Sequence, residues 1–167
     1  MDCILHLGVP QLKALSMCAA VRRRRRAVAG SRGTKRPSRR SPKHHRMVVD
    51  AARRLHDEAR SANERRVLVL TGGREACASA ADRVLDALPI PLTGTTLVST
   101  RDALACERVA PRSADELLGT TREAVAFDAH EDCRPNALGR VVGAVDGGGL
   151  LLVLAPPLDD WPARRDA

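Results

Sequence analysis

The chain has 167 residues, the size of a single domain, and 44% of them are hydrophobic, which is enough for an ordinary core. The net charge of +8 is divided unevenly, because residues 1–46 hold 13 Lys and Arg against one acidic residue, whereas residues 47–167 hold more acidic than basic groups. These figures argue against a membrane-spanning protein, since no apolar run approaches the ~20 residues that cross a bilayer, and against a folded body that is basic throughout.

The first 46 residues form a basic extension that we expect to be unfolded. Its first 20 residues do not make a secretory signal, because the arginines at 22–26 follow the apolar run and Lys13 interrupts it. Two interpretations of the extension stay open. It is an RNA-binding arm that neutralises phosphates without folding, or it results from an upstream start codon assigned in error, because Met47 opens a clean helical pattern.

The body, residues 47–167, opens with a predicted helix over residues 48–65, whose apolar side chains recur at three- to four-residue spacing. Residues 66–71 (RVLVLT) then predict a strand, and two glycines after it make a turn. A second helix is expected over residues 74–88 and ends at Pro89, because proline cannot continue it.

The middle of the body is less regular. A second strand is expected at residues 95–100 (TTLVST), followed by a short helix or turn at residues 101–107. Ser113 has a glutamate three residues later, which predicts a capping box and one helical turn that Gly119 ends.

The most informative stretch, residues 117–157, predicts one β-α-β crossover. Residues 123–128 (EAVAFD) predict a strand, and residues 150–155 (LLLVLA) predict a second one that is apolar on both faces, as in a sheet covered by helices on each side. Pro135 fits the first position of the helix between them, and three glycines at 147–149 are expected to end that helix.

Four strands separated by helical segments predict an α/β fold, a Rossmann-like three-layer sandwich. Its mainly parallel sheet would have about four strands with helices on both faces. Ligands of such sheets bind beyond the carboxyl ends of the strands. Those ends are predicted at residues 71–73, 99–101, 128–130 and 156–157.

The turn at residues 71–74 (TGGR) is the first candidate site, because amides between a strand and a helix can hold a phosphate. Plain turn chemistry explains two glycines there as well. The chain contains no GxxxxGK[ST] loop, no GxGxxG fingerprint and no pyrophosphate loop of the acetyltransferase kind.

A second candidate is the polar cluster that follows the third predicted strand. Asp128, His130, Glu131 and Asp132 with Cys133 suggest a metal site or an acid–base pair, but a single His-x-x-Cys pair is poor zinc spacing. A nucleophile made of Cys133 or Cys106 with His130 lacks an oxyanion hole and an orienting partner. We therefore expect no metal and no catalytic residue here.

Several short motifs of the body occur together in the order and near the spacing of one family. They are LLG at 117–119, an aspartate that closes a strand at 128, PNAL at 135–138 and GAV at 143–145, with a triple glycine before the last strand. With RVLVLTG and a Trp-Pro pair at 161–162, residues 47–167 resemble the N-terminal module of the tRNA(Met) cytidine acetyltransferase family. The motif residues, which we expect to be structural, are Leu117, Leu118, Gly119, Asp128, Pro135, Asn136, Gly147, Gly148 and Gly149.

The resemblance implies an enzyme that forms N(4)-acetylcytidine in tRNA. In the intact family, a helicase-like domain binds ATP with Mg²⁺ and a further domain binds acetyl-CoA. Neither domain is in this chain, so the expectation is an N-terminal fragment that is inactive alone, holds no cofactor and partners those domains and tRNA. The best candidates for RNA or interdomain contacts are Arg74, Arg101, Arg134 and Arg140.

The lysine and cysteine content of the chain indicates a source and a compartment. A body without lysine is typical of a GC-rich genome and of adaptation to salt, so an archaeal source is expected. Five cysteines without a CxxC pair indicate free thiols in a reducing compartment, the cytoplasm. Two other functions stay open: a stand-alone, non-catalytic module that docks RNA or a partner, and a small nucleotide-binding enzyme that uses residues 71–74. Tight tRNA binding or saturable ATP binding would discriminate them.

Overall fold

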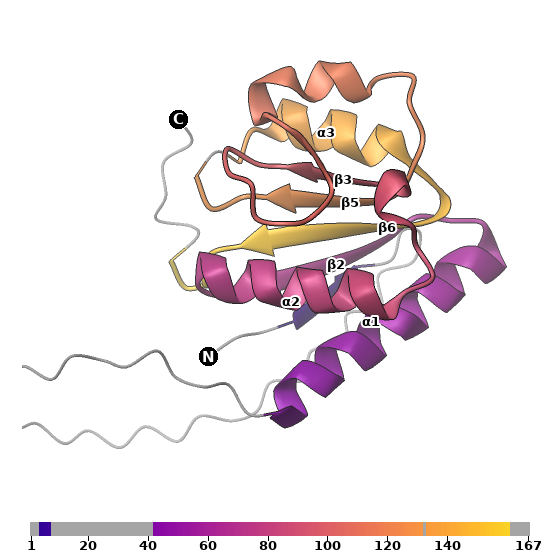
Figure 1. Ribbon diagram of the computed structural model, residues 1–167, viewed down its shortest axis with the longest axis vertical. Helices are drawn as coiled ribbons and strands as arrows, with labels where there is room; N and C mark the ends of the chain where they lie inside the picture. Colours follow the sequence, from indigo (N-terminus) through magenta and orange to yellow (C-terminus); the bar gives the residue numbers. More distant parts are fainter. Residues whose placement is uncertain (1–3, 8–41, 132, 161–167) are drawn as a thin grey trace, which may run out of the picture.

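Six strands form one sheet between two layers of helices in the computed structural model, which describes residues 4–7, 42–131 and 133–160 (Figure 1). The strand order across the sheet is β1-β2-β6-β5-β3-β4. The strands are β1 (Ile4–Leu7), β2 (Arg66–Thr71), β3 (Thr95–Val98), β4 (Glu107–Val109), β5 (Arg122–Asp128) and β6 (Val145–Ala155). The helices are α1 (Pro42–Ala62), α2 (Arg74–Ala87) and α3 (Pro135–Ala144), with 3-10 helices η1 (Leu92–Gly94) and η2 (Pro111–Leu117).

All strand pairs except one are parallel. β6 lies at the centre, pairs with β2 from Arg66↔Leu150 to Thr71↔Ala155, and pairs with β5 on its other side. β1 alone runs antiparallel, against β2. The expected α/β three-layer sandwich with a mainly parallel sheet is therefore confirmed, with β1 and β4 added to the four expected strands.

Two apolar cores lie on the two faces of this sheet. Alternate residues of the strands point to opposite faces, so Leu152 joins the core under α1 and α2, whereas Leu151 and Val153 join the core under α3 and η2. Phe127 is fully buried in the second core. Burying a side chain of this size contributes about 2–3 kcal/mol. The run LLLVLA of β6 is apolar throughout because both of its faces are covered.

The structure differs from the sequence expectation at several element boundaries. α1 begins at Pro42, five residues before Met47, since proline is tolerated in the first turn of a helix. Residues 101–107 form no helix; they bend and lead into the short strand β4. Ser113 is not an N-cap, because Ala110 caps η2 and Pro111 opens it. The glycines at 147–149 do not end α3; they lie inside β6.

The extension and the C-terminus are only partly described. Within residues 1–46, the structure places Ile4–Leu7 in the sheet and Pro42 onward in α1. The remaining residues of the extension, which we expected to be unfolded, lie outside the described residues. Trp161 lies outside them as well. Among the described residues, no helix is long and apolar enough to cross a membrane.

Candidate functional site

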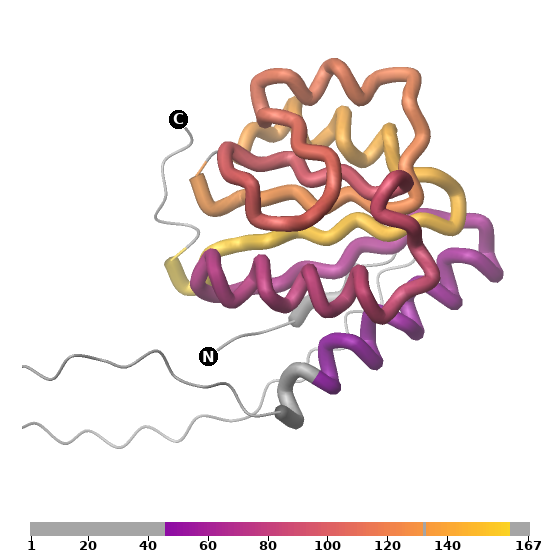
Figure 2. Tube along the Cα trace, in the orientation of Figure 1, coloured from indigo at the N-terminus to yellow at the C-terminus, as the bar shows by residue number. Residues whose placement is uncertain are grey.

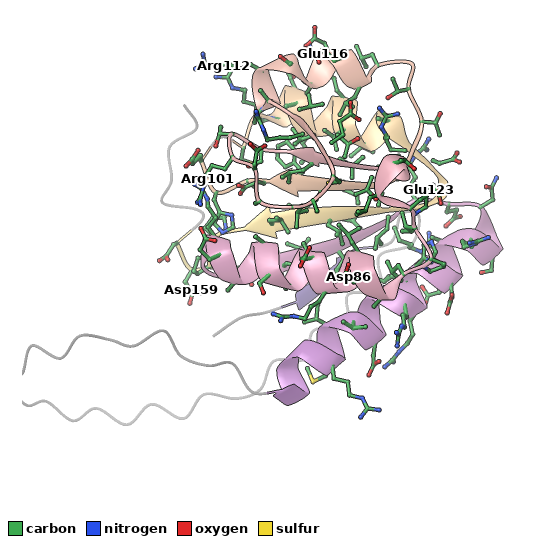
Figure 3. The ribbon with its side chains drawn as sticks, viewed as in Figure 1. Asp86, Arg101, Arg112, Glu116, Glu123 and Asp159 are labelled. Atoms are coloured by element: carbon green, nitrogen blue, oxygen red, sulfur yellow. The ribbon has the colours of Figure 1, made fainter. Side chains whose placement is uncertain are left out.

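The carboxyl ends of the parallel strands form the edge of the sheet where a ligand would be expected. α2 follows β2 on one face, α3 follows β5 on the other face, and β6 lies between β2 and β5. This is the arrangement in which the chain connections part and leave a crevice in doubly wound sheets. Figure 3 shows the side chains of Arg101 and Asp159 at this edge and that of Glu123 at the opposite one.

Asp128, the last residue of β5, is the centre of a polar network at this edge. Its side chain is only 7% exposed and accepts hydrogen bonds from the Ser99 hydroxyl at 3.0 Å and from the backbone N–H of His130 at 3.0 Å. Burial acts to raise the pKa of Asp128, but the hydrogen bonds from His130 and Ser99 outweigh it and lower the pKa. Asp128 is therefore an anion at neutral pH.

His130 bridges two loops that follow different strands. Its Nδ1 lies 2.8 Å from the Asp128 carboxylate, and its Nε2 lies 3.0 Å from the carbonyl oxygen of Gly72, at the end of β2. Burial acts to lower the pKa of His130, but hydrogen bonds with Asp128, Cys77 and Gly72 outweigh it and raise the pKa to about 9. At neutral pH the imidazolium therefore donates both N–H groups, and it ties the β2–α2 turn to the end of β5.

Arg74 and Glu131 extend the network toward solvent. The Arg74 Nε lies 3.7 Å from Asp128 Oδ2, and its Nη1 forms an ion pair with Glu131. Glu131 also accepts a hydrogen bond from the Thr100 hydroxyl, and the bonds from Thr100 and Arg74 lower the pKa of Glu131. Four charges, two of each sign, thus meet where a ligand would enter the crevice.

The network leaves little room for the chemistry weighed from the sequence. Both nitrogens of His130 are engaged as donors, so neither has a lone pair for a metal ion or for general base catalysis at neutral pH. The described residues contain no group of three or more potential ligands placed to hold a metal ion. In the turn at residues 71–74, the Gly72 N–H donates to the carbonyl oxygen of Ala155, and Arg74 pairs with Glu131.

The four arginines proposed as RNA or interdomain contacts do not lie together. Arg74 belongs to the network, and Arg101 forms an ion pair with Glu75 at 2.9 Å on the same edge of the sheet. Arg134 is the half-buried residue that precedes α3, and Arg140 is on the exposed side of α3. Their role as contacts to RNA or to other domains stays a prediction.

The motif residues divide into three groups. Asp128 is the centre of the network. Leu117 is 1% exposed at the end of η2, whereas Leu118 is 59% exposed beside it, and Gly119 has a φ of +77°. Pro135 and Asn136 belong with these residues to the second group, at helix boundaries, because they open α3 on its exposed side. The third group is the three glycines, Gly147, Gly148 and Gly149.

The glycine segment at the start of β6 receives the end of α1, as the tube in Figure 2 traces. A Cβ added to Gly147 would lie 2.6 Å from Asn63 Oδ1, and one added to Gly148, which has a φ of +86°, would lie 3.4 Å from Arg60 Cα. A Cβ on Gly149 would lie 2.8 Å from the Glu123 carbonyl oxygen. The sequence identified these residues, but only the structure shows their roles: Gly147 and Gly148 allow the end of α1 to pack closely on the sheet, and Gly149 allows the start of β6 to pack against β5.

A groove that the sequence did not indicate lies between α2 and residues 102–105. Its volume is about 370 Å³, and the carboxylates of Glu75, Asp82 and Asp102 line it. Arg101 binds Glu75 and Arg108 binds Asp102, so two of the three carboxylates already have a cationic partner.

Comparison with known proteins gives the context for this arrangement. The family model described as tRNA(Met) cytidine acetyltransferase TmcA, N-terminal, matches residues 41–167. The chain is 53% identical over 118 residues to the protein of that name from Haloarcula marismortui, a match that covers 71% of this chain and 15% of the relative. It is 52% identical over 120 residues to the Haloferax volcanii protein, covering 72% and 16%. Over 113 residues it is 37% identical to the Nitrosococcus halophilus protein, covering 65% and 14%.

Proposed function

Because the chain belongs to the tRNA(Met) cytidine acetyltransferase family, as its resemblance predicted, and corresponds to the N-terminal domain of that family, we propose that it serves an enzyme that acetylates a cytidine of tRNA(Met). The chain spans 15% and 16% of the length of the two relatives with the highest identities quoted above. The product would be N(4)-acetylcytidine, acetyl-CoA would donate the acetyl group, and ATP with Mg²⁺ would supply the energy. Each of these molecules would be bound outside the described residues.

Within that enzyme we assign this domain the role of a rigid, non-catalytic module. The observation that carries the proposal is the His130 bridge, since it joins two loops at the place where a sheet of this topology would hold a small ligand. A network whose charges are paired with one another suits a scaffold for other domains and for tRNA. The surfaces on which those partners would rest include Arg101, at the sheet edge in Figure 3, and Arg140, which is exposed on α3.

The proposal also includes an archaeal source and a cytoplasmic location. A lysine-free body and high identity to proteins of Haloarcula marismortui and Haloferax volcanii support an archaeal source. A protein that modifies tRNA would act in the cytoplasm.

A chimera tests the proposal. Residues 42–160 of this chain would replace the matching residues of the Haloferax volcanii relative, and mass spectrometry would measure N(4)-acetylcytidine formed from tRNA, acetyl-CoA and ATP. The chimera should form the product at a rate within about tenfold of the intact relative, because a change of ~1.4 kcal/mol at domain contacts alters a rate by that factor. The chain alone should form none.

Two outcomes would contradict the assignment. Product formed by the chain alone would mean that it carries catalytic residues. A folded but inactive chimera would mean that this domain does not replace its counterpart. A chimera with Gly149→Ala, which disturbs the packing of β6, is the control for a domain that is present but misfolded.

A further inference from the structure

The two outer sides of the parallel part of the sheet are built differently. β4, at one side, has three residues, of which Glu107 and Arg108 are exposed and charged. Short, charged edge strands resist the addition of another strand. β2, at the other side, has six residues and an unbroken register with β6, and its central residues 67–70 are valine and leucine. Left unpaired, β2 would be an apolar edge.

A strand from far along the chain covers that edge. β1 pairs with β2 from Ile4↔Leu70 to Leu7↔Val67, and it is the one antiparallel strand among those described. Residues 8–41 separate it from α1, and it lies outside residues 41–167, which the family model matches. β1 is therefore a strand from outside the matched region that pairs with the β2 edge of that region.

We propose that the outer side of residues 67–70 is a strand-addition site for an extended apolar segment, and that Ile4–Leu7 is its tethered, exchangeable occupant. In strand addition, main-chain hydrogen bonds supply the affinity and apolar residues on both faces supply the preference. Here Leu68 and Leu70 belong to the core under α1 and α2, whereas Val69 belongs to the opposite core, so β2 offers apolar residues on both faces beside an added strand. The connecting residues can reach roughly 110 Å when extended, which permits the strand to leave and return.

Hydrogen exchange of the full-length chain tests whether β1 occupies the site. Successive N–H groups of a strand point to opposite sides, so two amides of residues 67–70 face β6 and two face β1. The double variant Leu5→Pro/His6→Pro removes the N–H groups of two successive residues of β1. One of these two groups points toward β2, so the variant removes a hydrogen bond between β1 and β2. The amides that face β1 should then exchange at least about tenfold faster. Those that face β6 should be unchanged, which reports an intact fold.

The matched control is Leu5→Val/His6→Val, which keeps both N–H groups and should preserve the protection. The proposal would be overturned if the β1-facing amides exchanged equally fast in the wild-type chain and in the proline variant. That result would show that β1 does not occupy the edge.

A peptide of residues 1–9 tests exchangeability. Short tethers give effective concentrations of about 1 mM, so the peptide at several mM should restore at least half of the lost protection in the proline variant. The same peptide with both prolines should not. Failure of the unsubstituted peptide would make β1 a fixed strand. Protection that rises with protein concentration, together with a dimer in sedimentation, would assign the strand to a second copy. Either result overturns the tethered, exchangeable occupant.

Discussion

The His130 imidazolium connects three parts of the chain that are far apart in sequence. It contacts the carboxylate at the end of β5 and the carbonyl oxygen of Gly72 in the turn after β2, while Cys77 in α2 also contributes to its raised pKa. Hydrogen bonds to charged groups are worth about 1.5–3 kcal/mol each, and an unsatisfied buried partner costs a similar amount. This one side chain therefore ties the turn after β2 to the end of β5.

We expect His130→Gln to lower the free energy of unfolding by about 2 kcal/mol at pH 6, because glutamine keeps a neutral hydrogen bond and loses the charge. Urea denaturation of the two proteins measures the difference. Arg140→Gln, at an exposed position of α3, is the control and should change stability by less than about 0.5 kcal/mol.

The same difference should depend on pH with a defined sign. The folded pKa of His130 is about 9, above the unfolded value of 6.5, so its contribution is fully present below pH 6.5 and is lost as the pH rises through 9. Asp128 has a lowered folded pKa, so its contribution is present above its unfolded pKa and is lost as the pH falls. A wild-type-to-variant difference that grew between pH 7 and pH 10 would contradict the ion pair.

Gly149 and Gly139 should respond in opposite directions to alanine. Gly149→Ala places a Cβ 2.8 Å from both the Glu123 carbonyl oxygen and Val145 Cγ1, so we expect a loss of about 1–3 kcal/mol from overpacking. Gly139 has nothing within 4 Å of its Cβ position and lies in α3, so Gly139→Ala should gain about 0.5–1 kcal/mol. Thermal denaturation of both variants measures this; a stable Gly149→Ala protein would show that β5 and the start of β6 pack less tightly than described.

At the scale of elements, η2 and the residue after it show how neighbouring residues of one motif serve different purposes. Leu117 ends η2 inside the core under α3, whereas Leu118 caps it in solvent at 59% exposure. Figure 3 shows Arg112 and Glu116 of the same helix pointing away from the sheet. The side of η2 that carries Leu117 is therefore buried in the core under α3, whereas its opposite side is exposed to solvent.

Leucine-to-alanine changes at these two positions should separate packing from surface function. Leu117→Ala should cost about 2–5 kcal/mol through the cavity it leaves. Leu118→Ala should change stability by less than about 0.5 kcal/mol in the isolated chain, because its side chain is exposed. Chemical denaturation gives both values, and equal losses would mean that Leu118 packs against part of the same chain.

At the scale of the whole molecule, the internally paired charges at the carboxyl edge of the sheet predict that the described residues bind no nucleotide. A ligand present at 100 times its dissociation constant stabilises a protein by about 2.7 kcal/mol, which moves the melting temperature by several degrees. Millimolar ATP with Mg²⁺ should therefore leave the melting temperature unchanged within about 1 °C, as measured by differential scanning calorimetry. A saturable increase would reopen the small nucleotide-binding enzyme that the turn at residues 71–74 suggested.

The class of the fold, the four central strands and the family could be predicted from the sequence, because these depend on local patterns. A run such as residues 150–155 is apolar on both faces only when both are covered, and Pro135 suits a helix start wherever it occurs. The motif residues Asp128 and Gly149 could be identified from their order and spacing in the sequence, but their contacts could not be predicted from it.

Tertiary structure alone decided what those residues do. His130 and Gly72 are 58 positions apart, and their hydrogen bond exists because β2 and β5 end at the same edge on either side of β6. The short strand β4 and the antiparallel strand β1 have too few residues for a periodic signal, and their pairing comes from the sheet beside them. Local chemistry specifies elements, whereas contacts between distant segments depend on the order in which the sheet brings them together.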